Sequence, residues 1–161
     1  MRYWLMKSEP DEVSIGDVAA APDKTVAWFG VRNYQARNFM REMRPGDLAF
    51  FYHSSCASIG IAGIVEIASA SFPDATQFDP ASPYFDAKAT PDNPRWVSVD
   101  IRHVRTTRLV PLAELRTHPE LADMRLLAKG SRLSVTPVEP EEWRLIEGLM
   151  RQAGAGSGIP G

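Results

Sequence analysis

The sequence lacks the features that mark several classes of protein. Cys56 is the one cysteine in 161 residues, so the chain can form neither an internal disulfide nor a cysteine-based metal cluster. No apolar run approaches the roughly 20 residues that span a bilayer. Lys7, Glu9 and Asp11 interrupt the N-terminal segment before a signal-like apolar stretch is complete. We therefore expect a cytoplasmic protein, nuclear if the source is a eukaryote, with no membrane partner, no metal and no cofactor.

The sequence also lacks a surplus of positive charge. It contains 18 Lys and Arg residues against 20 Asp and Glu residues, which gives a formal net charge of −2. A protein that coats nucleic acid without specificity needs many Lys and Arg residues to displace counterions. The overall balance argues against that class, but it remains compatible with one local basic patch.

The composition is that of an ordinary folded domain. Hydrophobic residues make up 44% of the chain and charged residues 24%. The length fits one compact domain with a sizeable core. We expect a single domain over residues 1–150, followed by a flexible tail, rich in Gly and Ala, over residues 151–161.

Strand patterns outnumber helix patterns along the chain, and the helices flank the strands, which predicts an α+β fold. Gly60 and Gly63 lie inside one predicted strand, where they indicate a bulge or a closely approaching backbone and favour a small, partly closed barrel. Residues 72–95 contain five prolines and are predicted to form a long loop. The predicted strands are 3–6, 26–30, 48–53, 59–67, 96–104 and 133–138. The predicted helices begin after Ser14 as an N-cap, at Asn33 and at Glu139.

The sequence offers little catalytic machinery. The tail formally matches a dinucleotide-binding pattern at residues 156–161, but no helix follows it to direct its amides at a pyrophosphate. His53 and Cys56 are three residues apart without a visible third partner, and both a nucleophilic centre and a zinc site need one. We expect a strand-end histidine and a half-buried thiol there, and no catalytic residues.

Aromatic and basic residues are mixed around Trp28. Residues 28–44 contain four arginines and one acidic residue, and further basic runs lie at residues 102–108 and 129–132. Planar aromatic rings beside guanidinium and amide donors suit the stacking and edge recognition of a nucleobase. The alternative is that the arginines form a solvated helix face and that Trp28 is a core residue.

Several segments resemble the EVE domain family, among them YWLMKSEP (3–10), the long segment that contains VRNYQARN (31–38), and RLSV (132–135). The matching segments run in order over almost the whole chain, from about residue 2 to residue 150. The resemblance implies a PUA-like fold, a mixed β pseudo-barrel of about five or six strands with peripheral helices. EVE domains are related to YTH and ASCH domains, and the group is associated with the recognition of modified bases in DNA or RNA.

The resemblance also implies an aromatic pocket that holds such a base. Trp28 would stack on the base, and Tyr84 or Phe85 would form the opposite wall. Because that wall is not a tryptophan, the methyladenine preference of YTH domains is not carried over. The further implied pocket residues are Lys7, Ser8, Asn33, Ser54, Arg132 and Ser134. The expected phosphate contacts are Arg32, Arg37 and Arg41.

The sequence thus predicts a non-catalytic domain that binds DNA or RNA carrying a modified base. One alternative is a sensor of a small molecule or nucleoside, which would respond to nucleosides and not to oligonucleotides. A second alternative is an enzyme that acts on modified nucleic acid, which would release a product and would need a titratable group in the pocket.

Overall fold

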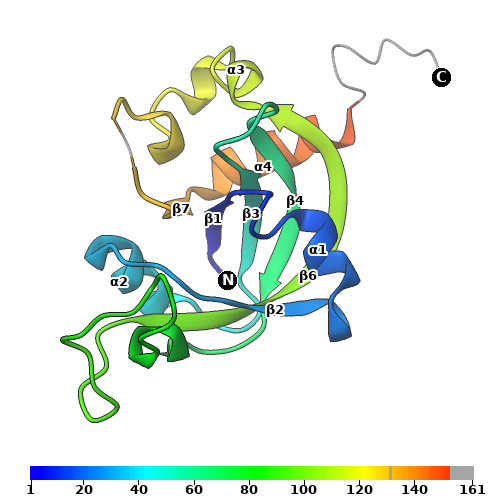
Figure 1. Cartoon of the computed structure of the whole chain (residues 1–161). Coiled ribbons are helices and arrows are strands. Elements are labelled where there is room, and N and C mark those ends of the chain that lie inside the picture. The colour runs from blue at the N-terminus through cyan, green and yellow to red at the C-terminus, as the bar shows by residue number, and fades with distance from the viewer. Residues whose placement is uncertain (131, 153–161) are drawn as a thin grey trace.

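A computed structural model describes residues 1–130 and 132–152 of the chain. A seven-stranded sheet with the order β2-β6-β4-β3-β1-β7 forms its centre, and β5 pairs with β6 outside this path (Figure 1). The strands are β1 Tyr3–Ser8, β2 Thr25–Trp28, β3 Leu48–His53, β4 Gly60–Ile67, β5 Phe72–Pro73, β6 Val97–Pro111 and β7 Val135–Val138. The helices are α1 Ile15–Ala20, α2 Tyr34–Glu42, α3 Leu112–Leu115 and α4 Pro140–Arg151. Short 3-10 turns cover Pro22–Lys24, Ala75–Phe78, Pro119–Leu121 and Arg125–Leu127.

The predicted α+β class and the PUA-like architecture are confirmed. The sheet has seven strands, one more than the five or six that were expected. The additional strand is β5, two residues long, inside the loop predicted to be irregular. β6 is 15 residues long and continues well beyond the predicted end at residue 104. Its second half carries Arg105, Thr106, Thr107 and Arg108, so the hydrophobic alternation is lost although the ladder with β4 continues.

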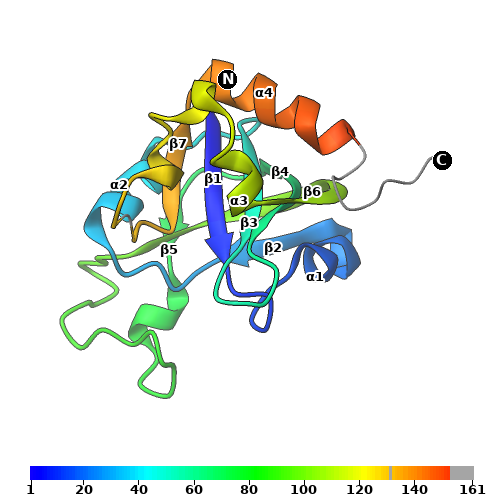
Figure 2. The same cartoon turned by 90° about the horizontal axis from the view of Figure 1, so that it is seen from above.

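The curvature of the sheet depends on the two glycines of β4. The β4–β6 register shifts between Ile61 and Gly63, and again between Ile64 and Val65, as in a bulged ladder. A Cβ atom at Gly60 or at Gly63 would lie closer than 3.0 Å to backbone atoms of β6. The predicted close approach of backbone at these glycines is therefore confirmed, and it allows β6 to bend around the sheet (Figures 1 and 2).

Residues that alternate along the strands separate two hydrophobic clusters. Trp4 and Phe51 belong to the first cluster, with buried residues of α1 and α2. Leu5 and Phe50 belong to the second, with residues of α3 and α4. Trp143 of α4 stacks on Phe50 with a centroid distance of 3.9 Å. Burial of side chains of this size stabilises the fold by about 1.5–3 kcal/mol each, so helices on both faces hold the strand ends in place.

The predicted helix cap at Ser14 is confirmed, and a second cap lies at Asn33, where the helical pattern was predicted to begin. The Ser14 side chain accepts a hydrogen bond from the Asp17 backbone N–H, and the Asp17 carboxylate accepts one from the Ser14 backbone N–H in a capping box. Asn33 Oδ1 accepts from the Ala36 backbone N–H at 3.0 Å and begins α2. The chain between β2 and α2 is therefore short and fixed at both ends.

At the C-terminal end, α4 includes Arg151, so the helix continues one residue into the segment predicted as a tail. The rest of that prediction, and the glycine-rich pattern in it, falls on residues 153–161, which lie outside the described residues. Within the described residues no helix is long and apolar enough to cross a membrane.

Candidate functional site

One edge of the sheet brings together polar residues that lie far apart in the sequence. β1 and β3 run parallel, and β7 runs antiparallel to β1, so two strand ends meet the beginning of β7. The Lys7 backbone N–H donates to the Ser134 carbonyl, and the Ser54 backbone N–H donates to the Ser8 carbonyl, both at 2.8 Å. Three serines and a lysine therefore lie side by side, held by backbone hydrogen bonds.

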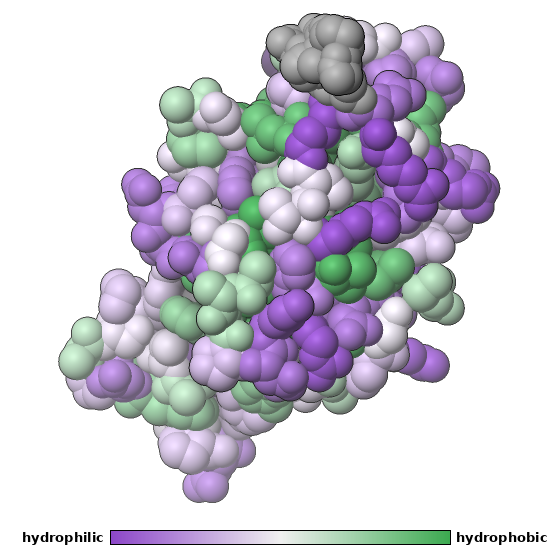
Figure 3. Space-filling view, turned by 90° about the vertical axis from the view of Figure 1, so that its right-hand side faces the viewer, coloured by the Kyte–Doolittle hydropathy of each residue, from purple (hydrophilic) through white to green (hydrophobic). Residues whose placement is uncertain are grey.

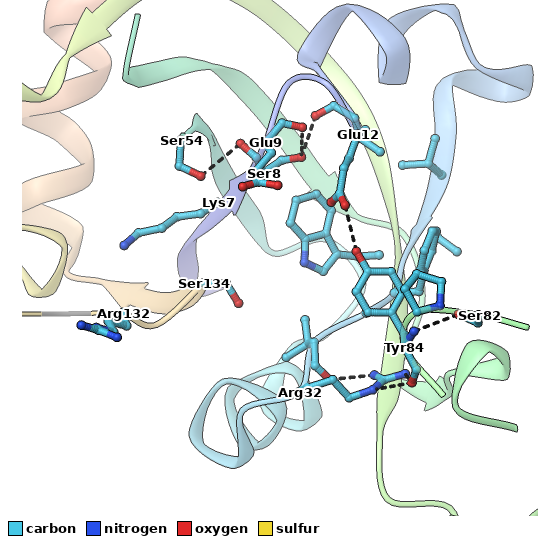
Figure 4. A pocket seen from close by; sticks show the side chains of 18 residues that line it. Lys7, Ser8, Glu9, Glu12, Arg32, Ser54, Ser82, Tyr84, Arg132 and Ser134 are labelled. Atoms are coloured by element: carbon cyan, nitrogen blue, oxygen red, sulfur yellow. Dashed lines mark hydrogen bonds between the residues drawn. The ribbon is translucent and has the colours of Figure 1, made fainter. Parts of the chain in front are cut away.

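This edge forms one side of a cavity of about 590 Å³, and β2, the segment after it and the loop at residues 82–84 form the others (Figure 4). Small-molecule sites commonly have volumes of about 300–1,000 Å³. The predicted pocket residues that line the cavity are Lys7, Ser8, Trp28, Ser54, Tyr84, Arg132 and Ser134. Arg32, a predicted phosphate contact, lines it as well.

Trp28 is both a core residue and a wall of the cavity. Its side chain is 8% exposed and packs edge-to-face on Phe51, with a centroid distance of 5.7 Å. The same residue lines the cavity. The core therefore fixes one side of the ring, and the residue also borders the cavity.

Tyr84 is fixed at three points. Its hydroxyl donates to Glu12 Oε1 at 3.0 Å, and its carbonyl accepts from Arg32 Nη2 at 2.7 Å (Figure 4). The ring lies against Gly30, where a Cβ atom would be 2.9 Å from the Tyr84 Cζ atom. Gly30 has a φ of +87°, which glycine adopts without strain. Burial raises the pKa of Tyr84, and the Glu12 carboxylate raises it further, so the phenol stays protonated at neutral pH.

A fully buried carboxylate, Asp74, ties the loop of Tyr84 to the segment after β2. It accepts from the Gly30 backbone N–H at 2.8 Å and from Arg32 Nη1 at 3.1 Å, and the Thr76 backbone N–H donates to its other oxygen. Burial alone would raise the pKa of Asp74, but these hydrogen bonds outweigh burial and hold the pKa below its ordinary value. Asp74 was not among the predicted site residues because it lies in an irregular loop without a motif.

The cavity also contains charges of both signs. Glu9 and Glu12 line it, and neither is part of the predicted pocket. Lys7 lines it too, and burial lowers the pKa of its ammonium group. Lys7 has no carboxylate within 4.0 Å among the described residues. The cavity therefore offers both hydrogen-bond donors and carboxylate acceptors beside its aromatic walls.

Comparison with known proteins identifies the family. The model of the EVE domain matches residues 2–149. The chain is a member of the EVE domain family. It is 42% identical to human thymocyte nuclear protein 1 over 165 residues, which cover 91% of this chain and 73% of that protein. It is 43% identical to the chicken protein of the same name, over 91% of this chain and 68% of that protein.

Solved structures agree with this assignment. A Pseudomonas putida protein is 54% identical and has a TM-score of 0.89, covering 92% of this chain and 99% of that chain. Human THYN1 protein, solved in complex with 5-methylcytosine containing DNA, is 41% identical with a TM-score of 0.89, covering 96% and 100%. An ASCH protein from Zymomonas mobilis, 9% identical with a TM-score of 0.53, shares the fold alone.

Four of the predicted residues lie outside the cavity lining of this EVE domain. Asn33 is occupied as the cap of α2, and Phe85 points away with 41% of its surface exposed. Arg37 donates to the Arg95 carbonyl at 2.9 Å, on the outer side of α2. Arg41 follows one turn later and lines a shallow hollow of about 360 Å³ beside Glu42. If these residues contact a ligand, they contact a part of the ligand that lies outside the cavity.

His53 and Cys56 have the structural surroundings expected for them. His53 Nε2 accepts from the Ile15 backbone N–H at 3.1 Å, and burial lowers the pKa of His53, which favours this neutral acceptor. Cys56 is partly exposed, and its thiol donates to the Ser58 carbonyl at 3.5 Å. Residues 1–130 and 132–152 contain no group of three side chains that would hold a metal ion.

The second basic run, on β6, lies on another side of the molecule. Figure 3 shows that side, where hydrophilic residues cover much of the surface between small hydrophobic spots. Each arginine of the run has a carboxylate partner: Arg102 with Glu66 at 3.1 Å, Arg105 with Glu147 at 2.8 Å, and Arg108 with Glu114 at 2.7 Å. These arginines therefore serve the fold.

Proposed function

We propose that this EVE domain is a non-catalytic reader that binds DNA or RNA by taking a modified base into the cavity between Trp28 and Tyr84. The observation that carries the proposal is the pair of aromatic walls, one on the core and one on a braced loop. A relative with 41% identity over almost the same length, human THYN1, has been solved with 5-methylcytosine containing DNA. We take 5-methylcytosine as the first base to test.

Stacking supplies the main driving force in this proposal. Extrusion of a base from a duplex costs a few kcal/mol. Stacking on an aromatic side chain contributes about 1–3 kcal/mol per base. Two rings that are already fixed lose little conformational freedom when the base enters, so their stacking largely offsets the cost of extrusion. A methyl group on the base adds apolar area to the same contact.

Polar groups at the edge of the cavity would distinguish one base from another. The Ser8 hydroxyl donates to the Val13 carbonyl at 2.6 Å, which leaves its oxygen free to accept. Glu9 and Glu12 offer carboxylate oxygens, which suit the exocyclic amino group of cytosine. Lys7 and Arg132 lie on the side of the cavity away from Tyr84 (Figure 4) and offer donors to a carbonyl or a phosphate.

A non-catalytic role is supported by how the hydroxyl groups are used. Those of Tyr84 and Ser8 donate within the protein, to Glu12 and to the Val13 carbonyl. We propose that residues 1–150 act as a single domain without a cofactor. Its place in the cell would be where the nucleic acid lies, in the cytoplasm of a bacterium or the nucleus of a eukaryote.

The test is a titration of matched DNA and RNA oligonucleotides that carry cytosine, 5-methylcytosine or 5-hydroxymethylcytosine at one position. We expect tighter binding of a modified strand, and we expect Trp28→Ala to abolish that preference. Tyr84→Leu should weaken it, while Tyr84→Phe, which keeps the ring, should largely retain it. Equal affinities for all strands, or a preference that survives Trp28→Ala, would contradict the proposal.

The same experiment separates the two other functions. A response to modified nucleosides in a thermal shift assay, without binding of oligonucleotides, would indicate a small-molecule sensor. A change in the mass of the modified base after incubation would indicate an enzyme.

A further inference from the structure

A second aromatic surface lies beside the cavity, on the outer side of α2. Tyr34, the first residue of α2, is 48% exposed. Its ring stacks on Trp96 with a centroid distance of 4.8 Å and an interplanar angle of 27°. Trp96 is 5% exposed, and its indole N–H donates to Asp86 at 2.8 Å, so the ring beneath Tyr34 is fixed.

Two arginines flank this ring. The Arg37 guanidinium lies 4.7 Å from the Tyr34 centroid and 5.9 Å from that of Trp96, and the Arg95 guanidinium lies 5.9 Å from Tyr34. A group on the face of Tyr34 opposite Trp96 would be much farther from Trp96 than 5.9 Å, so Arg37 lies beside the stacked pair. Tyr34 is therefore covered by Trp96 on one side, remains 48% exposed, and has two positive charges within 6 Å of its centroid.

Arg37 is more available to an anion than Arg95. Arg95 lies 3.5 Å from Asp86, which neutralises part of its charge. Arg37 uses three of its five N–H groups, two on Asn38 Oδ1 and one on the Arg95 carbonyl. Burial and the charges of Arg41 and Arg95 lower the pKa of Arg37. A bound phosphate would relieve this crowding of like charges.

The Tyr34 ring is connected to the cavity through Arg32. The Arg32 guanidinium lies 5.7 Å from the centroid of Tyr84, the cavity wall, and 5.5 Å from that of Trp96. Three contacts of less than 6 Å thus link Tyr84 to Tyr34 by way of Arg32 and Trp96. Successive bases of a duplex strand are about 3.4 Å apart along the helix axis, so nucleotides a few steps from a base in the cavity reach Tyr34.

We propose that Tyr34, flanked by Arg37 and Arg95, is a second nucleic-acid subsite, on which a base a few nucleotides from the one in the cavity stacks while Arg37 holds its phosphate. This inference rests on the proposed function and extends it. It makes the ligand a strand of nucleic acid instead of a free base, since a nucleoside fills the cavity but does not reach Tyr34.

The experiment uses the full chain and two probes. One is 5-methyldeoxycytidine, and the other is a set of oligonucleotides in which a 2-aminopurine, whose fluorescence falls when it stacks, lies a few nucleotides from one 5-methylcytosine. We expect Tyr34→Ala to weaken oligonucleotide binding about tenfold, within the usual contribution of one base–aromatic stack, and to abolish the quenching. Nucleoside affinity should stay unchanged, and Tyr34→Phe should bind as the unaltered protein does. Arg37→Gln should reduce the slope of the logarithm of affinity against the logarithm of salt concentration by about one, as expected for the loss of one phosphate contact. The control variant Arg144→Gln, in α4, should leave this slope unchanged.

Unchanged quenching and oligonucleotide affinity in Tyr34→Ala would overturn the subsite. So would an equal loss for nucleoside and oligonucleotide, because that indicates an indirect effect on the cavity. If the protein shows no preference for 5-methylcytosine but Tyr34→Ala still loses oligonucleotide affinity and quenching, the subsite is supported and the proposed function fails.

Discussion

The arginines of β6 and the cations around the cavity differ in their partners rather than in their number. Arg102, Arg105 and Arg108 each have a carboxylate within 3.1 Å. Lys7 and Arg132 line the cavity, and among the described residues neither has a carboxylate within 4.0 Å. The two cavity cations therefore lack the close ion-pair partners that the β6 arginines have, although Glu9 and Glu12 also line the cavity.

Arg32 is the exception, since it lies at the cavity but is paired with buried Asp74. Removal of one partner from a buried ion pair typically costs about 3–5 kcal/mol. We expect Asp74→Ala to lower the free energy of unfolding by about that amount and to release the loop of Tyr84. Urea unfolding followed by circular dichroism measures the first effect. A loss below about 1 kcal/mol, as for an exposed pair, would show that Arg32 belongs with the β6 arginines.

The same carboxylate predicts a dependence on pH. The pKa of Asp74 is depressed in the folded protein, so its contribution to stability is complete above the ordinary aspartate pKa of about 3.9. That contribution is lost as the pH falls through the lower, folded-state pKa. Unfolding measured at a series of pH values below about 4 should therefore show a steeper loss for the unaltered protein than for Asp74→Asn. Parallel curves would contradict the assignment.

At the cavity, neutralisation of a rim cation should affect binding and leave stability unchanged. Arg132 is exposed, so we expect Arg132→Gln to change the free energy of unfolding by less than about 0.5 kcal/mol. The affinity for DNA should fall, and the slope of its logarithm against salt concentration should decrease by about one. Fluorescence anisotropy at several salt concentrations measures both. An unchanged slope would mean that Arg132 contacts no phosphate.

The smallest effects are expected on β6. Arg105→Gln removes a partly exposed ion pair with Glu147, and pairs near the surface typically contribute about 0–1 kcal/mol to stability. DNA affinity and its salt dependence should remain those of the unaltered protein in the same anisotropy assay. A salt slope that decreases as much as in Arg132→Gln would remove the distinction between the two sides of the molecule.

Sequence periodicity and capping rules predicted the elements that depend on local signals. β3 has the predicted bounds, α1 begins after the predicted cap Ser14, and α2 begins one residue after Asn33, where the helical pattern was predicted to start. The second half of β6 was missed because its alternation is interrupted by polar residues, and only the pairing with β4 keeps it extended. Long-range pairing of this kind leaves no local pattern in the sequence.

The candidate site was predictable to a similar degree. Trp28 was recognisable because it lies outside a periodic hydrophobic face and beside basic residues. The serines of the cavity were suggested only by family resemblance, because parallel pairing of β1 and β3 is what brings Ser8 next to Ser54. Asp74 and the Tyr34–Trp96 stack depend on how an irregular loop folds against α2. Neither spacing nor composition encodes such a contact.

The most direct test of the modified-base pocket uses the four tryptophans of the chain as reporters. The indole N–H groups of Trp4 and Trp96 are hydrogen-bonded to Asp47 and Asp86, whereas Trp28 lines the cavity. In a ¹H–¹⁵N spectrum, a 5-methylcytosine oligonucleotide should shift the Trp28 indole signal strongly and the Trp4 signal hardly at all. The unmodified oligonucleotide should shift the Trp28 signal less. A Trp28 signal that stays in place while the DNA binds would contradict the pocket.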